Sequence, residues 1–137
     1  MAPVGYSGKP LYQKLGLAPG MECKVVQPPS DYEQLLDGVP PSVILTSRKR
    51  SGLDVVHVFA TSRKQLAAEL AKWRKLIQPA GMIWVSWPKK SARQATDITE
   101  DAIREVAFPL DLVDVKVCAV SQVWSGLKLV VRKDKRS

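Results

Sequence analysis

DVVHVFATSRKQLAAELAKWRKLIQPAGMIWVSWPKK, residues 54–90, is the stretch of this sequence that decides the fold. Residues 54–60 are almost all apolar, which is typical of a strand covered by helices on both faces. A helical stripe follows, with apolar side chains at intervals of three and four residues: Leu66, Leu70, Trp73 and Ile77. The stretch therefore predicts a buried strand, an amphipathic helix and a second buried strand.

Turn and capping residues set the boundaries of these elements. Ser62 and Gln65 have the spacing of a capping box, so the helix is predicted to begin there. Residues 79–81, Pro-Ala-Gly, predict a turn that ends the helix. The second strand is predicted over residues 82–87, and a basic loop follows it.

The remaining segments extend the alternation of strands and helices. Strands are predicted at 21–26 and 43–45, with a short helix between them that Ser30 or Asp31 caps. Thr99 is predicted to cap a later helix that Pro109 stops. Residues 112–120 and 124–131 predict a closing hairpin. We expect an α/β three-layer sandwich with a mostly parallel, Rossmann-like sheet and a C-terminal antiparallel hairpin.

Length and charge limit the domain organisation and the partners. The 137 residues suffice for one domain, which we place at 21–132, between an N-terminal arm with a short helix (1–20) and a basic tail (133–137). The net charge of +8 favours anionic partners, including nucleic acid, although no nucleic-acid motif accompanies it. Signal-peptide and membrane-span patterns are absent, so we expect a cytoplasmic protein. Cys23 and Cys118 are expected to be reduced thiols.

The order of these elements resembles a class I methyltransferase fold over roughly residues 20–132. More specific motifs resemble those of a family of small bacterial proteins of uncharacterised function: SGKPLYQKLGL (7–17), TSRKQL (61–66), WVSWPKK (84–90), TDITEDAIREVAFPLDLVDVKVCAV (96–120) and WSGLKLVVRK (124–133). The resemblance implies a methyltransferase-like domain of degenerate sequence, and it transfers no activity.

This sequence departs from the methyltransferase pattern where the cofactor S-adenosylmethionine would bind. In working enzymes of that fold, a glycine-rich turn follows the first strand, and an acidic residue at the end of the second strand holds the ribose. Here the first turn reads Gln27-Pro28-Pro29, and prolines lack the amide donors of such a turn. The second position, residues 45–48, has no carboxylate. We therefore expect no cofactor bound in the usual mode.

Candidate ligand-binding residues follow the predicted strands, because ligands of open α/β sheets bind beyond the strands' carboxyl ends. They are Gln27, Arg63, Ser86, Trp87, Lys89, Lys90, Trp124 and Ser125. Two tryptophans with two lysines suit a small anionic or planar ligand. The alternative interpretation is that the tryptophans are packing residues and the lysines are solvated.

Catalytic and metal-binding patterns are missing from the sequence. His57 is the only histidine, and its place in the middle of a strand predicts a buried, hydrogen-bonded side chain. Metal-ligand spacings, phosphate loops and nucleophile elbows do not occur. We expect a non-catalytic binding or regulatory module. A methyltransferase with an atypical cofactor site and a basic nucleic-acid accessory protein stay open as alternatives, as do the ligand and the oligomeric state.

Overall fold

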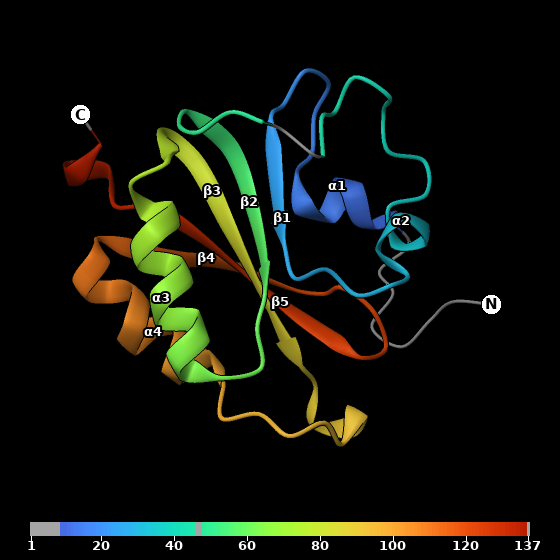
Figure 1. Cartoon of the computed structure of the whole chain (residues 1–137), viewed down its shortest axis with the longest axis vertical. Helices are drawn as coiled ribbons and strands as arrows, with labels where there is room; N and C mark the ends of the chain where they lie inside the picture. The colour runs from blue at the N-terminus through green and yellow to red at the C-terminus, as the bar shows by residue number, and fades with distance from the viewer. Residues whose placement is uncertain (1–8, 46–47, 137) are drawn as a thin grey trace.

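A single five-stranded sheet organises the chain in the computed structural model, which describes residues 9–45 and 48–136. The strands are β1 (Cys23–Val26), β2 (Leu53–Phe59), β3 (Ile77–Pro88), β4 (Leu112–Ala119) and β5 (Trp124–Val131). Their order is β1-β2-β3-β5-β4. β1, β2 and β3 pair in parallel, and β5 inserts antiparallel between β3 and β4 (Figure 1).

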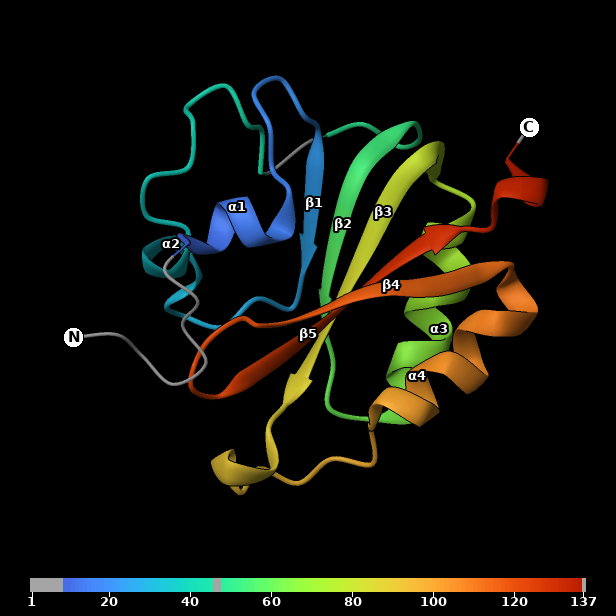
Figure 2. The ribbon, with the colours of Figure 1, turned by 180° about the vertical axis from the view of Figure 1, so that it is seen from behind.

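Helices cover both faces of this sheet, as Figures 1 and 2 show. Helices α1 (Leu11–Leu15) and α2 (Tyr32–Leu35) lie on one face, and α3 (Arg63–Arg74) and α4 (Glu100–Ala107) lie on the other. The described residues also form three short 3-10 helices: η1 (Lys90–Ala92), η2 (Phe108–Leu110) and η3 (Lys133–Lys135). The predicted three-layer α/β sandwich with a C-terminal antiparallel hairpin is confirmed.

Each face of the sheet has its own apolar core. Leu66, Leu70 and Trp73 of α3 pack on Val58 and Val85 of the sheet. On the opposite face, the core contains Leu11, Leu15, Tyr32, Phe59 and Trp84. Burial of these apolar side chains is the main contribution to the stability of the packed layers.

Two predicted boundaries were wrong. Ile77 is the first residue of β3 and not the last residue of the helix stripe, because α3 ends at Arg74. Pro79, Ala80 and Gly81 lie within β3, where the register against β2 shifts between Leu53 and Val55. A bulge tolerates proline because the extra residues leave the hydrogen-bonded ladder. Glycine is required at position 81, since a Cβ there would lie 3.0 Å from the backbone oxygens of Gln78 and Leu53.

The strand predicted at residues 43–45 is reduced to one parallel bridge between Glu22 and Ile44. Pro40 and Pro41 precede it, and proline cannot donate to a ladder. The second cofactor position at 45–48 includes Thr46 and Ser47, which lie outside the described residues.

Candidate functional site

The carboxyl ends of the strands meet at one edge of the sheet, which is the lower edge in Figure 1. β4 runs parallel to β3 because both are antiparallel to β5, so the turn that joins β4 to β5 reaches the same edge. Four connecting segments therefore gather there, at residues 27–31, 60–62, 89–99 and 120–123. This edge is the ligand position that an open α/β sheet predicts.

The turn after β1 has a backbone that suits glycine but carries other residues. Gln27 has a φ of 56°, in the left-handed region, and its side chain is exposed. Pro28 and Pro29 follow it and supply no amide hydrogen. A non-glycine residue in this conformation is uncommon. The turn thus offers few backbone donors where a methyltransferase would hold its cofactor.

Four of the predicted ligand-binding residues come together beyond the end of β3. Trp87, Lys89, Lys90 and Ser125 line one groove of about 680 Å³, and the first turn of α4 supplies its other wall. Trp87 pairs with Ser125 in the β3–β5 register, which explains their proximity. Trp87 is only 8% exposed, so it offers little surface on which a planar ligand could stack.

The other four predicted residues lie elsewhere. Ser86 is fully buried, and Trp124 packs edge-on against Phe59 at 5.1 Å between ring centroids. Because successive residues of a strand face opposite sides, Ser86 lies on the α1–α2 side of the sheet and Trp87 lies on the α3–α4 side. Arg63 pairs with Glu105 at 2.7 Å between nitrogen and oxygen. Gln27 lies at the end of β1 and does not line this groove.

A second hollow of about 630 Å³ adjoins the first and shares Lys89, Val117 and Ser125 with it. Its lining includes four lysines from three separate segments: Lys9 and Lys14 at α1, Lys89 after β3, and Lys116 in β4. Cys118 and Ser125 also line this hollow, which we call the lysine groove. None of the described residues that line it is acidic. Lys128 adds further positive charge because it lies opposite Lys116 in the β4–β5 register.

Lys14 is the most unusual of these lysines because its side chain is only 9% exposed. Its ammonium group donates to the carbonyl oxygen of Ala119 at 3.3 Å, and Lys116 donates in turn to the carbonyl oxygen of Lys14 at 3.4 Å. The two lysines therefore hold α1 against β4. Burying an ammonium group is costly unless it is hydrogen-bonded, and these contacts offset part of that cost.

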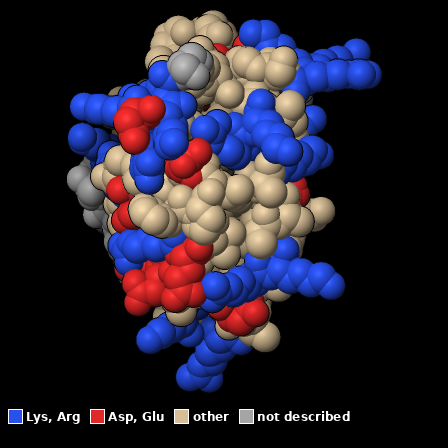
Figure 3. Space-filling model, turned by 90° about the vertical axis from the view of Figure 1, so that its left-hand side faces the viewer, with Lys and Arg blue, Asp and Glu red and all other residues tan. Residues whose placement is uncertain are grey.

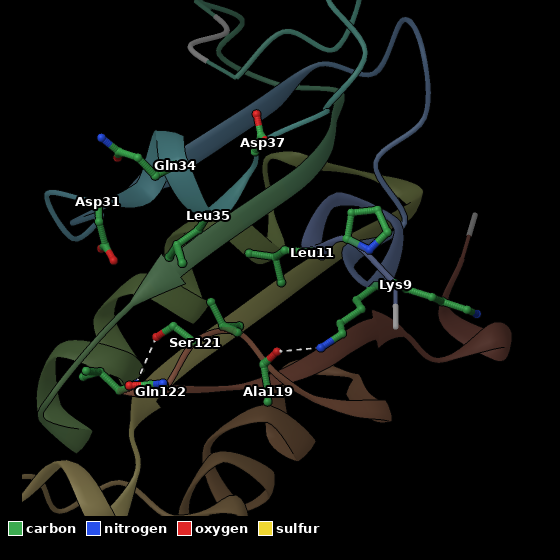
Figure 4. Close-up of a pocket in the computed structure, with 13 residues that line it drawn as sticks. Lys9, Leu11, Asp31, Gln34, Leu35, Asp37, Ala119, Ser121 and Gln122 are labelled. Carbon is green, nitrogen blue, oxygen red and sulfur yellow. Dashed lines mark hydrogen bonds between the residues drawn. The ribbon is translucent and has the colours of Figure 1, made fainter. Parts of the chain in front are cut away.

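A third hollow of about 500 Å³ lies on the other side of Lys14, between α1, α2 and the hairpin turn (Figure 4). Asp31 and Asp37, which flank α2, line it together with Ala119 and Ser121 of the hairpin. Lys9 and Lys14 line both this hollow and the lysine groove. Its mixed charges make it a poorer anion site than the lysine groove.

Cys118, in the lysine groove, is half-buried and free. Burial raises the pKa of its thiol above the ordinary value, although the nearby Lys14, Lys116 and Lys89 oppose that rise. The thiol is therefore protonated at neutral pH and is not an activated nucleophile.

His57 is buried and hydrogen-bonded at both ring nitrogens, as the sequence predicted. Nδ1 lies 2.9 Å from the hydroxyl of Tyr32, and Nε2 lies 2.7 Å from Oγ of Ser86. Burial lowers the pKa of His57 to about 3, so the ring is neutral at physiological pH. A serine beside a histidine has the geometry of a nucleophile and its base, but a fully buried Ser86 offers no access to a substrate. This chain of contacts stabilises the core.

Two other kinds of site find no support in residues 9–45 and 48–136. No group of three His, Cys, Asp or Glu side chains there could hold a metal ion. Helices long and apolar enough to cross a membrane are likewise missing from this part of the chain.

Comparison with known proteins identifies the fold. No protein-family model and no curated protein matches the sequence. A SAM-dependent methyltransferase from Aquifex aeolicus is similar in structure, with a TM-score of 0.59 and 13% identity over 88% of both chains. Fibrillarin from Aeropyrum pernix, in complex with natively bound S-adenosyl-L-methionine, has a TM-score of 0.58 and 12% identity over 92% of this chain and 70% of fibrillarin.

The chain therefore has a Rossmann-like fold of the methyltransferase type. At these sequence identities the similarity concerns the fold and does not extend to a reaction.

Of the residues that line the lysine groove, the sequence analysis predicted only Lys89 and Ser125 as ligand-binding candidates. Lys9 and Lys14 belong to the N-terminal segment at α1 and Lys116 belongs to β4, and only tertiary packing brings these two segments together. One signal was present: Lys14 lies three residues after Leu11, on the apolar side of a short amphipathic helix. A charged residue at such a position marks a buried or functional cation.

Proposed function

We propose that this protein is a non-catalytic module that binds a small anionic ligand in the lysine groove. The observation that carries the proposal is the convergence of four lysines, from three segments, on one concave surface whose described lining residues include no acidic residue. Like charges held together repel one another, and a bound anion relieves that repulsion. The anion would therefore stabilise the folded state as well as occupy the groove.

The adjoining groove at Trp87 supports a ligand larger than a simple anion. It shares Lys89 and Ser125 with the lysine groove, so one ligand can extend through both. Val117 adds apolar surface there, since it is 53% exposed. We therefore propose that the anionic group contacts the lysines while an apolar or planar portion lies over Val117.

Pyrophosphate is a suitable first probe, and the Lys89→Ala variant tests the site. Pyrophosphate is expected to raise the Tm of the protein at constant ionic strength, because a ligand that binds only the folded state stabilises it. Lys89→Ala is expected to weaken the binding by about tenfold or more, the usual value of a hydrogen bond to a charged group. Thermal unfolding across a pyrophosphate series measures both effects.

Lys64→Ala is the matched control, since Lys64 is exposed on α3 and does not line either groove. This variant removes the same charge but is expected to change the affinity by less than about twofold. Equal weakening in the two variants would mean that pyrophosphate responds to net charge and not to the lysine groove.

A methyltransferase with an atypical cofactor site is the second candidate, and the similarity in fold to SAM-dependent methyltransferases favours it. The left-handed Gln27 and the two prolines after it weigh against it. Calorimetric titration with S-adenosylmethionine separates the two candidates.

A further inference from the structure

The opposite edge of the sheet, where the parallel strands begin, carries a second concentration of positive charge. The basic triplet at residues 48–50 precedes β2, residues 72–75 end α3, and residues 132–136 follow β5. In Figures 1 and 2 these segments lie at the upper end of the molecule, away from the carboxyl ends of β1, β2 and β3. We call them, together with residues 108–111, the basic end.

Hydrogen bonds join these segments into one surface. The amide of Leu53 donates to the carbonyl of Leu76 at 3.1 Å, which places the loop before β2 beside the end of α3. Nε of Arg74 donates to the carbonyl of Leu110 at 2.8 Å. The amide of Arg132 donates to the carbonyl of Asp111, also at 2.8 Å. The basic end is therefore continuous from the 48–50 loop to the C-terminal segment.

The charge of the basic end is strongly unbalanced. It contains ten basic residues and only two carboxylates, Asp111 and Asp134. Asp111 lies 3.9 Å from Arg74, and Asp134 lies 3.3 Å from Arg132, so each carboxylate already faces a cation. Figure 3 shows basic side chains gathered over the upper part of this side, with isolated acidic groups among them.

Phe108 gives the basic end an exposed aromatic ring. Its side chain is 63% exposed, the highest value among the large hydrophobic residues that the structure leaves exposed. The guanidinium group of Arg132 lies 5.7 Å from the ring centroid. Proteins that bind single-stranded nucleic acid combine an exposed aromatic ring with a row of cations. The bases stack on the ring, and the phosphates contact lysine and arginine.

We propose that the basic end binds single-stranded nucleic acid, with Phe108 as a stacking platform for a base. Lys133 and Lys135, with the cations of the 48–50 loop, contact the phosphates. This surface is separate from the lysine groove, so the proposal does not depend on the small ligand proposed above. It requires no recognition of base sequence, since every base has a face that can stack.

Fluorescence anisotropy with a labelled oligouridine of about twenty nucleotides tests the proposal. The full chain is expected to bind it, and the affinity is expected to fall by about tenfold to a hundredfold between about 50 and 200 mM salt. K133A/K135A is expected to weaken binding at least about fivefold, because the variant removes two phosphate contacts. Absence of binding at the lower salt concentration would overturn the proposal.

The double variant K64A/R93A is the matched control, because it removes the same charge from exposed positions near the other edge of the sheet that line neither groove. It is expected to leave the oligouridine affinity within about twofold of the original value. Equal weakening by the two double variants would show that net charge alone governs binding, and would overturn the assignment to the basic end.

The Phe108→Ala variant distinguishes binding of a nucleic acid from binding of other polyanions. The variant is expected to weaken oligouridine binding by about fivefold or more, because base stacking is lost. Binding of inorganic polyphosphate, which has no bases, is expected to be unchanged. Equal affinity of Phe108→Ala and the original chain for oligouridine would contradict the stacking role and indicate an acidic partner of another kind.

Discussion

Trp84→Ala is expected to lower the free energy of unfolding by about 3–5 kcal/mol, the usual loss for a buried tryptophan. The side chain of Trp84 is fully buried in the core beneath α1, and its indole nitrogen donates to the carbonyl of Leu15 at 2.9 Å. The substitution removes packing atoms and also leaves that carbonyl without its donor. Urea unfolding at neutral pH, followed by circular dichroism, measures the loss.

Trp84→Phe separates the two contributions. Phenylalanine keeps most of the apolar volume but cannot donate to Leu15, so a loss of about 1–3 kcal/mol is expected from the unpaired carbonyl and the smaller ring. A loss below about 1 kcal/mol for Trp84→Ala would mean that α1 is not held against the sheet through this residue.

Acidification from about pH 7 to pH 5 is expected to lower the free energy of unfolding by about 2 kcal/mol through His57 alone. Burial lowers the pKa of His57 to about 3, whereas the unfolded chain has the ordinary value of 6.5. Between these two values the unfolded state binds a proton that the folded state does not bind. The stabilisation is therefore complete above pH 6.5 and is lost progressively as the pH falls towards 3.

His57→Gln is the control for this pH dependence. Because His57 is the only histidine of the chain, the variant removes histidine titration altogether. It is expected to be less stable at pH 7, since the contacts with Tyr32 and Ser86 change, but nearly insensitive to pH between 7 and 5. An unchanged pH dependence in His57→Gln, measured by urea unfolding at both pH values, would assign the effect to other groups.

Local signals in the sequence predicted the elements whose ends are set by nearby residues. Oγ of Ser62 accepts from the amide of Gln65 at 3.1 Å, and Oγ1 of Thr99 accepts from the amide of Ala102 at 3.0 Å, as the capping patterns indicate. Gln65 reaches back to the amide of Thr61 at 3.4 Å, one residue before the expected partner. Capping depends on a few adjacent residues, which explains why the sequence is informative there.

Features that depend on distant segments were predicted less well. Pro79 indicates a turn by itself, but the register shift between β2 and β3 accommodates it within a strand. Residues 43–45 have the composition of a strand, yet only Ile44 forms a bridge. Strand pairing is decided by the partner strand as well as by the segment's own composition.

In the candidate site, too, the sequence predicted some features, whereas others depend on distant segments. The carboxyl-end rule correctly brought Trp87, Lys89, Lys90 and Ser125 to one groove. It did not separate Ser86 and Trp124, which the alternation of side chains along β3 and β5 places on the other face of the sheet. The contribution of Lys14 to the lysine groove required knowledge that α1 packs beside β4.

Parallel calorimetric titrations of the purified protein with pyrophosphate and with S-adenosylmethionine test the central claim most directly. We expect saturable heat with pyrophosphate, with an affinity at least about tenfold weaker in Lys89→Ala and nearly unchanged in Lys64→Ala, and no heat with S-adenosylmethionine at millimolar concentration. Saturable, equimolar binding of S-adenosylmethionine together with no heat from pyrophosphate would contradict this claim. That result would mean that the turn at Gln27-Pro28-Pro29 still holds the cofactor.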